Sequence, residues 1–318
     1  MKLRVLYHGH CFDGVASAAT FTRFYHERMN GRAEVNYAGL LHRPGNLFDE
    51  GMFDGDENAI VDFKYSSSPK LTWWFDHHQS AFLTPEDEAH FRAENSDRKF
   101  LDPNRKSCTE FIADIAHTRF GFDAEPIRDL VHWAHVIDGA LYKSPAQSVE
   151  LKEPPLQLMQ VIESDPDETF IEQVIRELTR LSLHEVATSG EVQARFQPIL
   201  KQHQDTLEVV RRKAICQAGV VQFDLIDEGY EGFNKFIPYY LFPEASYTVA
   251  LTRGPKRTKI SVGSNPWAPR PRRHNIASIC ERYGGGGHAV VGAISFAPDE
   301  VEKGRAVLRE IVAELQSG

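Results

Sequence analysis

The chain has 318 residues, of which 42% are hydrophobic and 25% charged, and its formal net charge is -9. This length suffices for two domains with separate cores. The negative charge argues against a protein that coats long nucleic acid, because such binding needs a broad Lys and Arg surface. No apolar run reaches the length of a signal core or a membrane span, so we expect a soluble cytoplasmic protein without membrane contact. The cysteines show no paired spacing, which fits a reducing compartment.

The first part of the chain alternates predicted strands and helices. A strand over residues 2–7 precedes a helical pattern over residues 15–25, and further strands are predicted near residues 34–38 and 59–62. Another apolar run, over residues 71–74, leads into Asp76. Such alternation is typical of an α/β fold with a parallel sheet.

Helical pattern follows this region and continues to about Ala218. One helix opens at Ser107, another covers residues 127–137, and residues 183–214 predict a long connecting helix with one break. Short strands return from Gly219. We therefore expect a first domain of residues 1–184, a helical linker of residues 185–215, and a smaller α/β domain of residues 216–318.

The second domain contains the run Tyr283-Gly284-Gly285-Gly286-Gly287-His288, between a predicted helix at 276–282 and a strand at 291–296. Without side chains, the glycine backbone can approach an anion closely, and His288 adds a polar contact. A glycine run alone would fit a tight turn better. The basic residues Arg270, Arg272 and Arg273 precede it, whereas the cluster at 253–257 fits a solvated hairpin tip.

Metal-binding residue types gather where three predicted strands end. The first strand runs into His8-Gly9-His10-Cys11-Phe12-Asp13, the third ends at Asp62, and the run at 71–74 leads into Asp76-His77-His78. In a parallel sheet these ends open at one edge, where such folds place their ligands. Carboxylate and imidazole together suit divalent ions. The sequence therefore predicts a metal centre.

Asp76-His77-His78 together with Gly284 to His288 resembles the DHH phosphoesterase superfamily with its DHH-associated carboxy-terminal domain, over essentially the whole chain. The resemblance implies a parallel-sheet lobe joined by a linker helix to a smaller α/β lobe, and a centre of two divalent metal ions, usually Mn²⁺. Relatives include nanoRNases, pAp phosphatases, cyclic-dinucleotide phosphodiesterases and RecJ-type exonucleases.

The resemblance also implies roles for individual residues. Asp62 would bridge the two metals, and His78 would contact the scissile phosphate. Asp138 fits the fourth family motif, with Asp129 as the alternative. Asp76 would bind metal or, as we favour, hold His77 in the correct tautomer. The implied metal ligands are His8, Asp13, Asp62, His77 and Asp138.

The first family motif is altered in this chain. Cys11 replaces an aspartate, and His8 is one residue out of phase, so His8 or His10 must complete the first metal site. A thiolate at Cys11 would bias that site toward Fe²⁺ or Zn²⁺. Otherwise Cys11 is a small packed residue.

Substrate binding is implied for Gly285, Gly286, Gly287 and His288. The family's usual arginine after the preceding strand is missing from residues 259–265, so Arg270, Arg272 or Arg273 would take its place. We expect an Mn²⁺-dependent phosphodiesterase or exonuclease that acts on short oligonucleotides or dinucleotides. Alternatives are a pAp phosphatase, a single-strand exonuclease and a nucleotide-binding sensor without turnover, and a homodimer is one option for its assembly.

Overall fold

The computed structural model describes residues 1–43, 45, 47–94 and 96–317, and they form two compact units. Unit 1 comprises Met1–Tyr142 and Lys152–Gln197, and unit 2 comprises Lys143–Leu151 and Pro198–Gly318. The boundary between Gln197 and Pro198 falls inside the stretch expected as a linker. Residues 143–151 join unit 2 because their backbone carbonyls accept hydrogen bonds from that unit, Val149 O from His203 Nε2 at 2.7 Å and Ser148 O from Asn234 Nδ2 at 2.8 Å.

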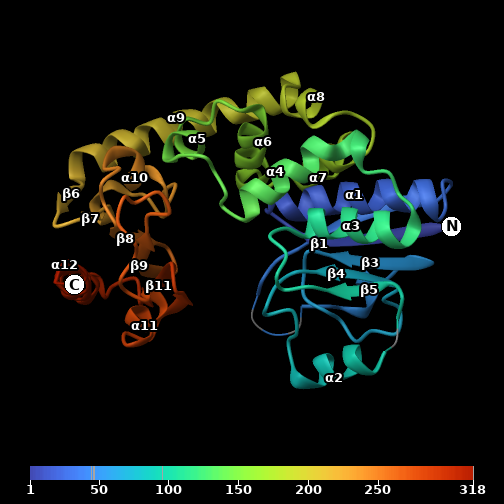
Figure 1. Cartoon of the computed structure of the whole chain (residues 1–318), viewed down its shortest axis with the longest axis horizontal. Coiled ribbons are helices and arrows are strands. Elements are labelled where there is room, and N and C mark those ends of the chain that lie inside the picture. The colour runs from blue at the N-terminus through green and yellow to red at the C-terminus, as the bar shows by residue number, and fades with distance from the viewer. Residues whose placement is uncertain (44, 46, 95, 318) are drawn as a thin grey trace. The chain divides into compact units, whose positions relative to one another are not determined.

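Unit 1 contains a five-stranded sheet whose strands are all parallel (Figure 1). Its strands are β1 (Lys2–His8), β2 (Glu34–Leu40), β3 (Glu57–Val61), β4 (Trp73–Asp76) and β5 (Lys99–Leu101), in the order β2-β1-β3-β4-β5. Because β2 lies on one side of β1 and β3 on the other, the strand order reverses between β1 and β3. Open α/β sheets bind ligands at such a switch point.

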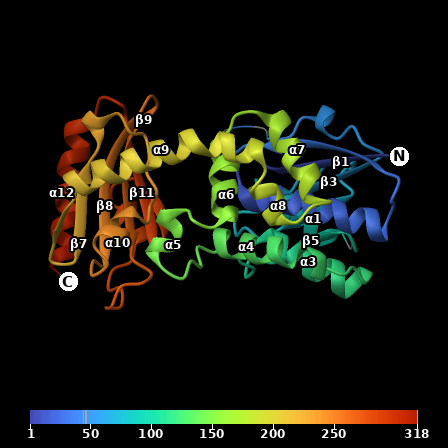
Figure 2. The ribbon, with the colours of Figure 1, turned by 90° about the horizontal axis from the view of Figure 1, so that it is seen from above.

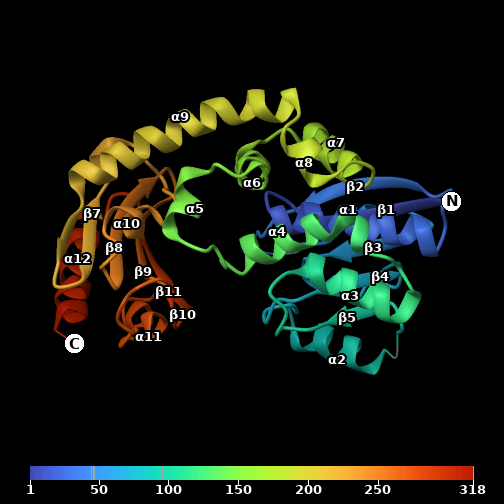
Figure 3. The same cartoon turned by 45° about the horizontal axis from the view of Figure 1, so that its top comes forward.

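Helices cover both faces of this sheet. Helix α1 (Phe12–Arg28) is buried along most of its length and packs against the sheet, α3 (Cys108–Phe120) and α4 (Arg128–Asp138). Helix α2 (Pro85–Ala93) lies on the face opposite α1, as Figures 1 and 3 show. The view from above in Figure 2 shows α1 over β1 and β3 on the other face. The remaining helical segments of unit 1 are η1 (Glu50–Met52), η2 (Glu125–Ile127), α6 (Pro154–Ser164), α7 (Glu168–Leu178) and α8 (Leu183–Ala187).

Two adjacent tryptophans fix the register of β4. Trp73 faces α1, with its ring 5.7 Å from Phe24, whereas Trp74 faces the other side, 5.0 Å from Phe91 of α2. Successive side chains of a strand point to opposite faces, and burial of a large apolar side chain contributes about 1.5–3 kcal/mol. A shift by one residue would exchange the two rings. The position of Asp76 at the end of β4 is therefore strongly determined.

Unit 2 contains a six-stranded mixed sheet, in which only the β7–β8 pair is parallel among the described pairings. Its strands are β6 (Ile215–Gln217), β7 (Val220–Asp224), β8 (Tyr247–Gly254), β9 (Arg257–Ser264), β10 (Gly286–His288) and β11 (Val291–Phe296), in the order β10-β11-β9-β8-β7-β6.

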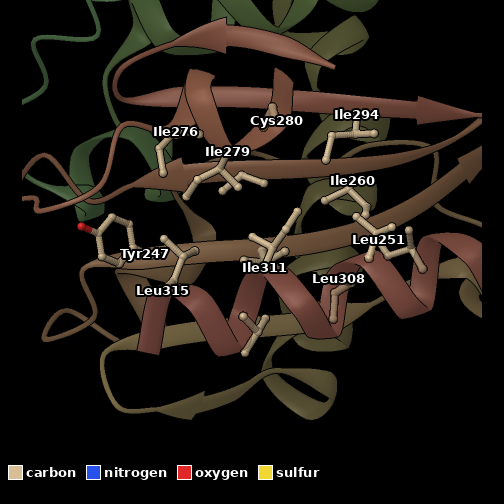
Figure 4. Close-up of a cluster of buried hydrophobic side chains, with 14 of the residues drawn as sticks. Tyr247, Leu251, Ile260, Ile276, Ile279, Cys280, Ile294, Leu308, Ile311 and Leu315 are labelled. Atoms are coloured by element: carbon tan, nitrogen blue, oxygen red, sulfur yellow. The ribbon is translucent and has the colours of Figure 1, made fainter. Parts of the chain in front are cut away.

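One face of this second sheet carries the core of unit 2. Figure 4 shows Leu251, Ile260 and Ile294 from the strands facing Leu308 and Ile311 of α12 (Val301–Gln316). The other helical segments near this unit are α5 (Pro145–Glu150), α9 (Gly190–Lys213), η3 (Ile226–Glu228), α10 (Ile237–Leu241) and α11 (Ile276–Glu281). Alternate strand residues, including Lys259 and Ser261, must therefore point to the opposite face.

The predicted two-lobe α/β fold is confirmed. The connecting helix expected over residues 183–214 consists of α8 and the longer α9, with the break at Thr188 and Ser189. Among the described residues, no helix combines the length and the apolar character needed to cross a membrane.

Candidate metal centre

The three predicted strand ends meet at one edge of the first sheet. His8 is the last residue of β1, Asp62 directly follows β3, and Asp76 is the last residue of β4. These strands are neighbours in the sheet and run in the same direction. Asp62 has a left-handed backbone with φ 57°, an uncommon conformation for non-glycine residues, and strained conformations of this kind cluster at functional sites.

Asp62 lies at the middle of the cluster and is almost completely buried, with 1% of its surface exposed. Its Oδ2 atom is 3.2 Å from His8 Nδ1 and 3.7 Å from Cys11 Sγ. Its Oδ1 atom is 3.3 Å from His77 Nε2. The two oxygens of one carboxylate thus face two different groups of donors, as expected of a bridging ligand.

His77 is held with one nitrogen directed at three carboxylates. Its Nδ1 atom is 3.1 Å from the carbonyl oxygen of Arg105, and because a carbonyl only accepts, Nδ1 carries the proton. In the neutral ring, Nε2 is then the lone-pair nitrogen. It lies 3.3 Å from Asp62 Oδ1, 3.5 Å from Asp138 Oδ2 and 3.7 Å from Asp13 Oδ2.

Asp13 is positioned by the amino terminus of α3. Its carboxylate accepts hydrogen bonds from the backbone N–H groups of Cys108 at 2.6 Å and Thr109 at 3.1 Å. The following residue is Gly14, where a Cβ atom would lie 2.1 Å from the carbonyl oxygen of His8. Glycine at this position therefore lets α1 begin directly against the end of β1, which brings Asp13 to the cluster.

Asp76 orients His78. Its Oδ1 atom accepts a 2.7 Å hydrogen bond from His78 Nδ1 and a 2.8 Å hydrogen bond from the backbone N–H of His77. The expectation that Asp76 would hold the His77 ring was wrong, since the Arg105 carbonyl performs that task. Sequence reasoning missed Arg105 because its contribution is a backbone atom, which residue type does not reveal.

The electrostatics of the cluster are those of several acids held close together. Burial raises the pKa of Asp13 well above its usual range, and the neighbouring Asp62 carboxylate raises it further. Burial and Asp62 likewise raise the pKa of Asp138 to about 6. Burial disfavours the charged form of His77, but the contacts with Asp62 and Asp13 outweigh it and raise the pKa to about 10. A positive charge is therefore strongly favoured at this place.

The residues present fit a metal centre. The described residues form three groups whose ligand atoms lie within 4.8 Å of one another: His8, Cys11 and Asp62; Asp62, His77 and His78; and Asp13, His77 and Asp138. Asp62 Oδ1, Asp76 Oδ2 and His77 Nε2 are buried without a hydrogen-bond partner among the described residues. Buried polar atoms normally have a partner, and a bound cation would provide it.

Two other candidates lie apart from these groups. His10 is exposed, has a left-handed backbone with φ 52°, and borders a small hollow together with Tyr7 and Glu168. Asp129 is 79% exposed at its side chain and lies 3.7 Å from Arg128. The structure thus brings His8 rather than His10, and Asp138 rather than Asp129, into the cluster.

The glycine run of unit 2 forms an edge strand, β10, paired with β11. A Cβ atom added at Gly285 would lie 2.3 Å from the carbonyl oxygen of Ala293, and one added at Gly287 would lie 2.3 Å from the carbonyl oxygen of Val291. The glycines are therefore needed for close pairing with β11. Gly286 differs, because a Cβ atom there would meet nothing within 4 Å.

Gly286, Gly287 and His288 border a hollow of about 470 Å³ on the face of the second sheet opposite its core. Thr252, Lys259, Ser261 and Ala293 line its floor, and Glu231, Phe233 and Lys235 line a second side. The side-chain amine of Lys259 makes no ion pair or hydrogen bond with the described residues. Burial and the nearby Arg257 lower its pKa, as for a cation that lacks an anionic partner.

The proposed substrate-binding arginines do not line this hollow. Arg270, Arg272 and Arg273 are exposed, and the Arg272 guanidinium donates to the carbonyl oxygen of His274. Gly285 does not line it either. Sequence reasoning overlooked Lys259 and Lys235, although the strand alternation around Ile260 places Lys259 on the face away from the core.

Comparison with known proteins yields structural matches alone, since neither a family model nor a curated protein matches the sequence. The pGpG-specific phosphodiesterase PggH from Vibrio cholerae matches with a TM-score of 0.68 and 18% identity, covering 98% of this chain and 99% of PggH. The DHH domain protein PF0399 matches with a TM-score of 0.56 and 13% identity, covering 99% and 87% of the two chains.

RecJ from Thermus thermophilus, solved with Mn²⁺, gives a TM-score of 0.55 at 14% identity and covers 98% of this chain. The present chain spans about half of RecJ, 52% of its length. Likeness at these identities concerns the fold. The chain has the two-lobe α/β fold of the DHH phosphoesterases, in agreement with the resemblance of its motifs.

Proposed function

We propose that this protein is a metal-dependent phosphodiesterase that hydrolyses short oligonucleotides or dinucleotides. The observation that carries the proposal is the buried Asp62 carboxylate, whose two oxygens face separate donor groups and whose Oδ1 lacks a hydrogen-bond partner among the described residues. The full-length likeness to PggH, a phosphodiesterase of a dinucleotide, supports the substrate class.

The centre would hold two divalent ions, with Mn²⁺ as the expected cofactor. His8 and Asp62 would bind on one side, and Asp13, Asp62, His77 and Asp138 on the other. Bound ions would supply a water of lowered pKa and stabilise negative charge on the phosphoryl oxygens. The hydrogen bonds from the start of α3 to Asp13 and from His77 to the Arg105 carbonyl keep these ligands in place beforehand.

His78 would contact the scissile phosphate. Burial alone would lower its pKa, but the hydrogen bond to Asp76 outweighs this effect and raises it above the ordinary value. With Nδ1 bound to Asp76, the Nε2–H of the imidazolium is left for a phosphate oxygen. A preorganised donor of this kind stabilises the charge that develops in the transition state.

The hollow in unit 2 would bind a nucleotide portion of the substrate. Lys235, Lys259 and His288 offer cationic or polar contacts for phosphate, and the ring of Phe233 offers an apolar surface for a base. The volume of about 470 Å³ is in the usual range for small-molecule sites. The net charge of -9 favours such a local site over the coating of long strands.

The proposal is tested by hydrolysis of a 5′-phosphorylated ribodinucleotide with Mn²⁺, comparing the native protein with Asp62→Asn. We expect mononucleotide products from the native protein and their loss in Asp62→Asn, whereas Asp129→Asn, a change at an exposed acid, retains activity. Absence of native turnover would reject the dinucleotide substrate. Turnover of 3′-phosphoadenosine phosphate alone would assign the phosphatase activity instead, and turnover of single-stranded DNA alone would assign the exonuclease activity. If none of these substrates is hydrolysed, a nucleotide-binding sensor is favoured.

A further inference from the structure

The two oxygens of Asp62 face donor groups of different chemistry. On the Oδ2 side lie an imidazole and a thiol, His8 Nδ1 at 3.2 Å and Cys11 Sγ at 3.7 Å. On the Oδ1 side lies His77, whose Nε2 also faces the carboxylates of Asp13 and Asp138. The first group contains sulfur, and the second contains imidazole and oxygen donors.

We propose that Cys11 is a metal ligand and that the centre has two unlike halves. The half formed by His8, Cys11 and Asp62 selects Zn²⁺ or Fe²⁺, because a thiolate is a soft donor. The half formed by Asp13, His77 and Asp138 accepts Mn²⁺, because carboxylates are hard donors. This inference rests on the metal centre of the proposed function and specifies which ions its two sides prefer.

The backbone position of Cys11 supports a ligand role. Cys11 is the N-cap of α1, a position that Ser, Thr, Asp and Asn favour because their side chains accept a hydrogen bond from the first helical turn. A thiol is a weak acceptor, and Cys11 forms no side-chain capping bond of ordinary geometry. Its sulfur lies 3.7 Å from Oδ2 of the buried Asp62 carboxylate and so faces the proposed metal site.

The surroundings of Cys11 also differ from those of a packed core thiol. Cys108 and Cys280 are buried, whereas Cys11 is only partly buried. Three kinds of ligand atom, a sulfur, a nitrogen and a carboxylate oxygen, converge at this place within 4.8 Å. Asp62, which completes the group, is 1% exposed, and its Oδ2 faces both the imidazole of His8 and the thiol of Cys11. This convergence of ligand atoms at a buried carboxylate indicates that a cation belongs here.

The first test uses Co²⁺ as a spectroscopic probe of the metal-free, reduced protein. We expect a sulfur-to-cobalt charge-transfer band in the near ultraviolet, and its loss in Cys11→Ser. Cys216→Ser is the matched control, because Cys216 is also partly buried but lies in unit 2, and it should keep the band. Absence of the band in the native protein, or its loss in Cys108→Ala but not in Cys11→Ser, would overturn the proposal.

A second test measures selectivity and does not depend on the folding of Cys11→Ser. The protein is loaded with Mn²⁺, titrated with Zn²⁺, and the released Mn²⁺ is followed by electron paramagnetic resonance. We expect the native protein to release one Mn²⁺ per chain at low Zn²⁺ and the other at higher Zn²⁺. In Cys11→Asp the first release shifts to higher Zn²⁺, since an oxygen donor replaces sulfur. An unchanged release curve in Cys11→Asp contradicts a sulfur ligand.

Neither readout requires turnover. A charge-transfer band in a protein that hydrolyses no nucleotide would reject the proposed function and leave the thiolate site standing. Hydrolysis of dinucleotides by a protein that shows no band would support the proposed function and reject the thiolate site.

Discussion

His77 Nε2 lies 3.3 Å from Asp62 Oδ1, and neither atom has a hydrogen-bond partner among the described residues. Since the Arg105 carbonyl fixes the proton on Nδ1, neutral His77 presents a lone pair to a carboxylate oxygen. Two electron-rich atoms at this distance repel each other unless a proton or a metal ion lies between them. The cluster therefore favours binding of a cation, and several measurable properties follow.

Metal binding should raise the thermal stability of the native protein. A metal ion that binds only the folded state stabilises it by about 2.7 kcal/mol at a concentration of 100 times its Kd. We expect a rise in Tm when Mn²⁺ is added to protein treated with a chelator, measured by scanning calorimetry. Asp62→Asn should lose most of this rise, and Asp129→Asn should retain it. An equal rise in all three proteins would place the stabilising metal elsewhere.

Metal binding should release protons near neutral pH. Burial lowers the pKa of His77, but the contacts with Asp62 and Asp13 outweigh it and raise this pKa to about 10 in the metal-free protein, so the ring is protonated at pH 7. A metal ligand must be deprotonated, and the ion therefore displaces this proton. Affinity should rise with pH up to about this value. Below pH 6, protonation of Asp138, whose pKa burial and Asp62 raise to about 6, should weaken binding further.

The proton release is measured by titration calorimetry in two buffers with different heats of ionisation. The difference between the apparent binding enthalpies gives the number of protons released. His77→Gln, which removes the titrating ring, should bind more weakly and with a smaller pH dependence. Binding that is independent of pH between 6 and 9 would show that His77 is not displaced from its protonated form.

The outcome at the metal centre shows what sequence can and cannot predict. Asp62, His77 and Asp76 could be placed because apolar runs such as Trp73-Trp74 define buried strands, and parallel strands share one ligand-binding edge. The partners of these residues could not, because they are backbone groups: the Arg105 carbonyl and the N–H groups of Cys108 and Thr109. Residue type does not encode which backbone atom approaches from a distant loop.

In unit 2, the sequence could not predict the lining of the hollow, for a different reason. The glycine run and His288 are conspicuous in sequence, and so are the arginines at 270–273, which were therefore assigned to the substrate. Lys259 lies within an ordinary hairpin strand, and only the register of β8, β9 and β11 shows that it shares a face with Thr252 and Ser295. Side chains far apart in sequence converge through strand pairing, which local patterns do not specify.

Asp76→Asn should reduce turnover more than metal content. Asp76 Oδ1 accepts the hydrogen bond that fixes His78 and supports its positive charge, and loss of such a supporting contact typically costs 10–100-fold. We expect a fall of about this size in kcat for a 5′-phosphorylated dinucleotide, with the Mn²⁺ content by atomic absorption retained. Asp299→Asn, at an exposed aspartate of unit 2, is the control. A parallel loss of bound Mn²⁺ would identify Asp76 as a ligand instead.

Lys259→Gln should weaken substrate binding. The amine lines the hollow at Gly286 without a carboxylate partner among the described residues, so a phosphate would be its first anionic contact. Loss of one charge-assisted contact should raise KM for a phosphorylated dinucleotide about tenfold, with kcat little changed. Lys256→Gln is the matched control, because Lys256 lies at the exposed tip of the same hairpin. An unchanged KM for Lys259→Gln would remove Lys259 from the binding site.

Gly14→Ala should destabilise unit 1 and disturb the metal centre together. The added Cβ would lie 2.1 Å from His8 O and 2.8 Å from His8 Cβ, so either α1 or the end of β1 must move. Forced overpacking of this kind costs about 1–3 kcal/mol and at times more. Displacement of His8 or Asp13 should also weaken metal binding. Urea unfolding followed by tryptophan fluorescence, with and without Mn²⁺, measures both effects.

Gly190→Ala is the control for this change. A Cβ at Gly190, the first residue of α9, would meet nothing within 4 Å, and alanine lowers the entropy of the unfolded chain. We expect no loss, or a gain of up to about 1 kcal/mol, with normal metal binding. If Gly14→Ala behaved like Gly190→Ala, the close approach of α1 to His8 would not be a requirement of the fold. The placement of Asp13 would then depend on its hydrogen bonds to α3 alone.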